Sequence, residues 1–66
     1  MSMTKEQIEE RLQNIDRAIS IMEKRKVNCI STYGTVPEII VDRLNNLYYQ
    51  KEEMIKMRRS LEMVKL

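Results

Sequence analysis

The sequence predicts an all-α protein, an antiparallel two-helix hairpin of the coiled-coil type, and three observations predict it. Apolar residues recur at alternating four- and three-residue steps, the a/d pattern of a heptad repeat. Two helix-start signals, one at Thr4 and one at Thr35, divide the chain into two such stretches. With one glycine, one proline, no tryptophan and no phenylalanine among 66 residues, the chain offers little turn chemistry for a sheet.

The first helix is predicted to span about residues 5–33. Thr4 can cap its start, Gln7 stands three residues later as in a capping box, and Met3 can pack on Ile8. A narrow apolar stripe follows on one face, interrupted only by Lys26. The stripe consists of Ile8, Leu12, Ile15, Ile19, Met22 and Cys29. One stripe of this width predicts one partner helix.

Two residues are candidates for the end of this helix. Asn28 and Gly34 both tolerate the left-handed conformation that terminates many helices, and Gly34 adopts it with less strain. We therefore expect the turn at about residues 34–35, which leaves two helices of nearly equal length.

The second helix is predicted to span about residues 36–64. Thr35 is a capping residue, Pro37 suits a first turn, and Glu38 completes a capping box. The apolar a/d stripes of the two helices, which we call the seams, support this division. A reversal at residues 34–35 brings four pairs of d positions face to face. These pairs are Ile8 with Leu61, Ile15 with Met54, Met22 with Leu47, and Cys29 with Ile40. The 66 residues are predicted to form a single helical-hairpin domain.

Two cations, Lys51 and Arg58, interrupt the apolar stripe of the second helix at heptad spacing. A functional interpretation makes them a site for a phosphate or an acidic partner. In the structural interpretation, Glu9 and Asp16 on the flank of the first helix pair with them while their aliphatic stems cover the seam. Charges close to such seams are usually solvated or paired, so the pattern favours the structural interpretation.

A second set of apolar residues on the second helix is the strongest functional signal. Three of its members recur every seven residues outside the seam, one lies beside them, and two occupy the other flank. We predict that this set binds a partner: Val41, Leu44, Tyr48, Ile55, Met57 and Val64. An apolar surface too broad for one neighbouring helix indicates a further packed surface. Dimerisation into a four-helix bundle and docking of a different protein are both open, and they are compatible.

The sequence predicts no enzyme, no metal and no cofactor. Histidine, the commonest acid–base residue, is absent, and neighbouring carboxylates such as Glu52 and Glu53 diverge on a helix. Cys29, the only cysteine, falls on the seam and is interpreted as a small core residue that function does not need. We therefore expect a small non-catalytic protein–protein interaction or regulatory protein, such as an adaptor, inhibitor or assembly factor.

Charge and hydropathy set the expected surroundings of the chain. Twelve basic and ten acidic side chains leave a net charge of +2, which singles out neither nucleic acid nor a membrane. No window approaches the apolar length of a spanning helix, and a single thiol fits a reducing compartment, so we expect a cytoplasmic protein. A hairpin of this size is also expected to need association, with itself or with a client.

In length and predicted shape the chain resembles two helical-hairpin classes: the plasmid copy-number protein Rop and the small co-chaperones of type III secretion. The Rop resemblance implies a dimeric bundle that binds RNA or DNA through outward basic residues, here Arg17, Lys24 and Arg25, and it is the alternative function. A small phage- or plasmid-encoded regulator would fit the first function, that of an interaction or regulatory protein. Residues 33–48 are similar to hairpin phosphatases of sporulation phosphorelays, but residues 41–45 depart from their Ser-Gln-Glu-Leu-Asp signature, so no residue role is carried over.

Overall fold

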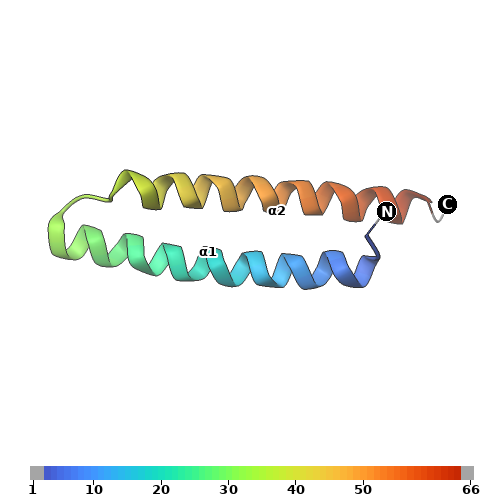
Figure 1. The fold of residues 1–66 in the computed structure, drawn as a ribbon, viewed down its shortest axis with the longest axis horizontal. Coiled ribbons are helices and arrows are strands. Elements are labelled where there is room, and N and C mark those ends of the chain that lie inside the picture. The colour runs from blue at the N-terminus through green and yellow to red at the C-terminus, as the bar shows by residue number, and fades with distance from the viewer. Residues whose placement is uncertain (1–2, 65–66) are drawn as a thin grey trace.

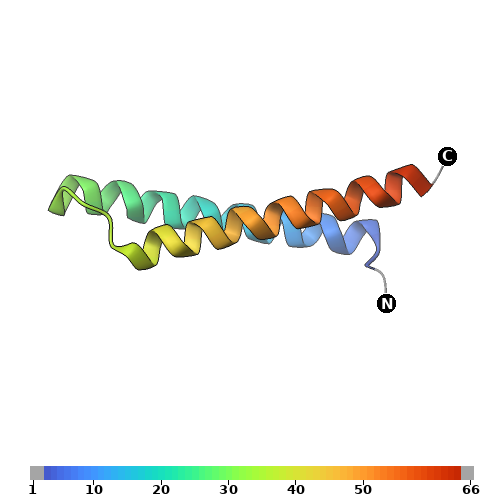
Figure 2. The ribbon, with the colours of Figure 1, turned by 90° about the horizontal axis from the view of Figure 1, so that it is seen from above.

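The computed structural model describes residues 3–64, and within them the chain is a two-helix hairpin. Helix α1 (Lys5–Tyr33) and helix α2 (Glu38–Val64) run antiparallel and pack against each other, as Figure 1 shows. From above, the helices cross at a shallow angle near their middle (Figure 2). The predicted all-helical hairpin is confirmed.

Both ends of α1 follow the local signals of the sequence. Thr4 caps the start: its hydroxyl oxygen accepts from the Gln7 backbone N–H at 3.2 Å, and the Gln7 side-chain oxygen accepts from the Thr4 N–H at 3.0 Å. At the other end Gly34 has a φ of 74°, and its N–H donates to the Ile30 carbonyl at 2.9 Å. Asn28 lies inside the helix, so Gly34 ends α1.

Helix α2 begins at Glu38, two residues later than the sequence suggested. Its first carbonyl acceptor is Pro37, which receives the N–H groups of Ile40 at 3.0 Å and Val41 at 3.4 Å. The ring of a proline disfavours helical geometry in the residue before it, and here that residue is Val36. This restriction outweighs the capping preference of Thr35 and extends the turn to residues 34–37.

The core lies between the helices and draws unequally on them. Five residues of α1 are buried: Ile8, Leu12, Ile15, Ile19 and Met22. Only Leu44 is buried from the described part of α2, although Ile40, Leu47 and Met54 are partly buried and pack against the same cluster. The predicted partners Ile15 and Met54 thus belong to one cluster, as do Met22 and Leu47. Because α2 buries so little, several of its apolar side chains, such as Val41 and Tyr48, remain exposed.

Candidate functional site

Three apolar residues of α2 form a line along one flank of the hairpin. Val41 and Tyr48 are 40% and 46% exposed, and Ile55 is half-buried. Each lies seven residues from the next, so they share one face of the helix, adjacent to the seam. We call Val41, Tyr48 and Ile55 the α2 strip.

The other predicted partner-binding residues do not join this strip. Leu44 is only 4% exposed and belongs to the hairpin core, so its assignment to an exposed face was wrong. The reason is its spacing: four residues after Ile40 and three before Leu47, it continues the seam itself. Met57 is 43% exposed, but two helical steps from Ile55 turn it to the opposite flank. Val64 ends α2, and its side chain lies outside the described residues.

A hydrogen bond fixes the central residue of the α2 strip against α1. The Tyr48 hydroxyl donates to the Glu23 carboxylate, with 2.9 Å between the oxygens. This hydrogen bond raises the pKa of Tyr48 above its ordinary value, and desolvation and the charge of Glu23 act in the same direction. The ring is therefore held at the junction of the two helices.

A polar groove of about 350 Å³ runs beside the α2 strip and carries both signs of charge. On its α1 side lie Glu9 and Asp16, and on its α2 side Lys51 and Arg58. Lys51 pairs with Asp16, with 2.8 Å between Nζ and Oδ1, as the structural interpretation of the sequence predicted. Within residues 3–64, Arg58 and Glu9 line the same groove without forming an ion pair.

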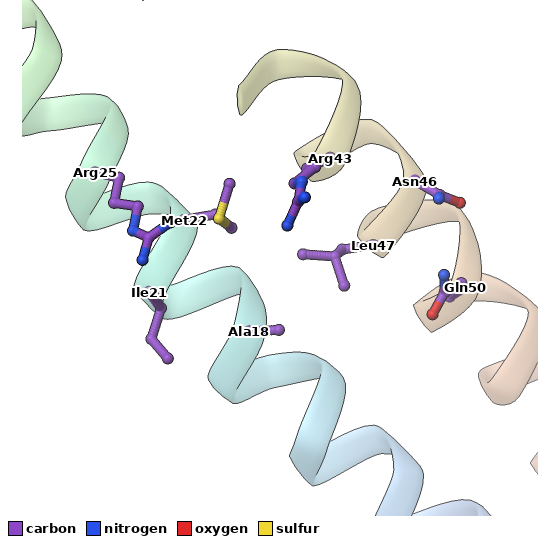
Figure 3. Close-up of a pocket in the computed structure, with 8 residues that line it drawn as sticks. All are labelled: Ala18, Ile21, Met22, Arg25, Arg43, Asn46, Leu47 and Gln50. Carbon is purple, nitrogen blue, oxygen red and sulfur yellow. The ribbon is translucent and has the colours of Figure 1, made fainter. Parts of the chain in front are cut away.

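The other side of the hairpin carries a second groove, of about 390 Å³, which Figure 3 shows. Its floor is aliphatic and consists of Ala18, Ile21, Met22 and Leu47. Its polar rim consists of Arg25 from α1 and Arg43, Asn46 and Gln50 from α2. In Figure 3, Met22 and Leu47 point toward each other and Arg43 extends into the space between the helices. We call these eight residues the arginine groove.

The three cations proposed for nucleic acid are exposed but do not share one surface. Arg17 and Lys24 are seven residues apart on the outer line of α1, whereas Arg25 is on the rim of the arginine groove. Arg43, which faces the same groove from α2, is not among the residues predicted from the sequence. The predicted pairing register could have identified it, because Arg25 and Arg43 occupy corresponding flanking positions of two antiparallel helices.

Cys29 is half-buried with a free thiol, consistent with a small packing residue. Within the described residues, no cluster of three histidine, cysteine or carboxylate side chains is arranged to hold a metal ion. In the same part of the chain, neither helix combines the length and apolarity needed to cross a membrane. No protein-family model matches this sequence, and no curated protein or solved structure is significantly similar to it.

Proposed function

We propose that this chain is a small, non-catalytic, cytoplasmic protein–protein interaction protein that associates through the α2 strip, first with a second copy of itself. The observation that carries this proposal is the exposure of Val41 and Tyr48 at heptad spacing, beside a core that is formed by other residues. A lone hairpin of this length has a small core, and burying the strip against a further helix pair supplies the missing apolar contact.

The charges beside the strip support a symmetric dimer as the first occupant. In a two-fold interface each residue of one copy meets the symmetry-related surface of the other, so a surface with both signs of charge can complement itself. The groove next to Ile55 has this property, with Glu9 on one wall and Arg58 on the other. Because these two side chains do not pair within the described hairpin, a second copy can pair them.

The test replaces the apolar surface of the strip while sparing the seam. We expect the Tyr48→Ser, Ile55→Ser double variant to self-associate at least about tenfold more weakly in analytical ultracentrifugation, since truncated interface anchors commonly cost that much. Its helicity in circular dichroism should persist, because Ile15, Met22 and Leu47 are untouched.

A matched control removes two exposed apolar side chains of α2 that are away from the strip. Ile39 and Met63 are 62% and 70% exposed, and neither lines the depression that Tyr48 and Ile55 share. The Ile39→Ser, Met63→Ser variant should sediment like the original chain. Equal assembly of the original chain, the strip variant and the control variant would contradict the proposal. So would a monomeric original chain, if it and the strip variant capture the same proteins from the host.

Nucleic-acid binding is the second candidate, favoured by one observation. Arg17, Lys24 and Arg25 are exposed and form no ion pair within residues 3–64. Binding of RNA or DNA through phosphate contacts weakens steeply as salt is raised, whereas apolar docking does not. A salt series with a labelled oligonucleotide therefore separates the two functions.

A further inference from the structure

The two sides of the hairpin differ in how their charged groups are satisfied. Within residues 3–64, both polar contacts between the helices are on the side of the α2 strip: Tyr48 with Glu23, and Lys51 with Asp16. On the other side, Arg25 and Arg43 are exposed and have no ion-pair or hydrogen-bond partner within residues 3–64. The rim of the arginine groove therefore carries two positive charges and no acid to balance them.

The groove does not stop at these two arginines. A second depression on the same side shares Gln50 with it and extends along α1 to Arg11, with Glu53 as its one acidic side chain. From Arg25 to Arg11 is fourteen residues, or about 21 Å at 1.5 Å per residue. The whole side is thus an elongated, mainly basic channel about four helical turns long, with an aliphatic floor.

We propose that this channel binds an acidic amphipathic helix of a partner protein, which lies between α1 and α2 as a third helix. Helix-in-groove recognition places apolar side chains on a hydrophobic floor, here Ala18, Met22 and Leu47. The small side chain of Ala18 lets another helix approach closely. Glutamates or aspartates on the two flanks of the incoming helix then meet Arg25 on one wall and Arg43 on the other, as charge-assisted hydrogen bonds.

Charge and shape disfavour the other occupants. A two-fold dimer centred on Arg25 and Arg43 would bring the arginines of both copies together, and like charges across an interface are costly. Nucleic acid gains little from an aliphatic floor. Tyr49 lines the second depression, but no aromatic ring lines the groove beside Arg25 and Arg43, where the unbalanced positive charge lies, for a base to stack on. The channel is also separate from the α2 strip, so the two surfaces can be occupied together.

The test uses a designed 21-residue peptide of three heptads, with leucine at a and d and glutamate at e and g, labelled for fluorescence anisotropy. We expect the original chain to bind it, and the Arg25→Glu, Arg43→Glu variant to bind it at least about tenfold more weakly, from the loss of two charged contacts. A second peptide with lysine at e and g should bind the Arg25→Glu, Arg43→Glu variant more tightly than it binds the original chain. Arg17→Glu, Arg59→Glu is the matched control, because it makes the same change of charge away from the groove.

Four results would overturn the inference. The first is no binding of the glutamate peptide to the original chain, and the second is an equal loss of binding in the control variant. The third is groove-dependent binding of a labelled 20-nucleotide RNA instead of the peptide. The fourth is loss of self-association in the groove variant by sedimentation, which would assign the channel to a second copy. Circular dichroism checks that each variant folds, and Arg25→Gln, Arg43→Gln gives the same comparison if charge reversal unfolds the hairpin.

Discussion

Lys51 reaches across the hairpin to Asp16, with 2.8 Å between Nζ and Oδ1. The lysine occupies an a position, where a hairpin of this kind otherwise places apolar side chains, and the ion pair is how the fold accommodates it. Both side chains remain substantially exposed, at 37% and 54%, so water and salt screen the attraction. The ion pair therefore gives the charge of Lys51 a partner beside the seam but adds little to the stability of the fold.

This relationship predicts a small and salt-sensitive effect of breaking the pair. Asp16→Asn should lower the free energy of unfolding by about 0.2 to 1 kcal/mol at low salt, and the difference should vanish in concentrated salt. Lys51→Met should instead stabilise the hairpin by roughly 1 kcal/mol, since it adds apolar contact to the seam. Urea titrations at two salt concentrations measure both effects. A large loss in Asp16→Asn that persists at high salt would contradict the screened pair.

The end of α1 depends on the conformation of one glycine. Gly34 has a φ of 74°, and a Cβ built there meets no atom within 4 Å. Gly34→Ala should therefore cost about 1 to 2 kcal/mol of stability through backbone strain alone, without a steric clash. Asparagine tolerates this region better, so Gly34→Asn should cost less than Gly34→Ala. Chemical unfolding of the two variants gives the comparison, and equal losses would indicate that side-chain contact, not φ, sets the cost.

The elements that the sequence predicted correctly depend on signals a few residues apart. The Thr4–Gln7 capping box is read from two residues three positions apart, and Gly34 is the only glycine in the chain. The start of α2 was placed too early because two local signals compete there. Thr35 favours a cap, but Pro37 keeps the preceding residue extended, and the proline restriction is the stronger one.

The surfaces were harder to predict, because they combine residues from both helices. The heptad recurrence of Val41, Tyr48 and Ile55 draws Leu44 into the predicted partner-binding set, although its spacing from Ile40 and Leu47 places it in the seam. The arginine groove joins Arg25 to Arg43, which are eighteen positions apart in the sequence. Such a site can be predicted only from the pairing register of the two helices, because the register sets which flanking positions face each other across the seam.

The hydrogen bond between Tyr48 and Glu23 predicts a pH dependence at alkaline pH. Because the folded protein holds the phenol proton more tightly than the unfolded chain does, the pKa of Tyr48 is raised on folding. The associated stability is fully present below the unfolded pKa of about 10 and is lost as pH rises through the folded value. Nuclear magnetic resonance of ring-labelled tyrosine, assigned with Tyr48→Phe, should show the Tyr48 pKa falling toward its ordinary value in Glu23→Ala. An unchanged Tyr48 titration would mean that the hydrogen bond is not formed in solution.

Leu44 and Val41 lie on the same helix three residues apart, yet they should respond in opposite ways to truncation. Leu44 is 4% exposed within the core cluster, and replacing a buried leucine by alanine costs about 2 to 5 kcal/mol. A core of this size rarely supplies more than about 3 to 5 kcal/mol, so Leu44→Ala should leave the chain largely unfolded in circular dichroism at 25 °C.

Val41 is 40% exposed and belongs to the α2 strip. Val41→Ala should therefore keep the helicity of the original chain, and its effect should appear in the assembly state measured by sedimentation. The comparison separates the residues that hold the hairpin together from those that are free to contact a partner. A Leu44→Ala protein as helical as the original, with weakened assembly instead, would move Leu44 back to the interaction surface and require a different register for α2.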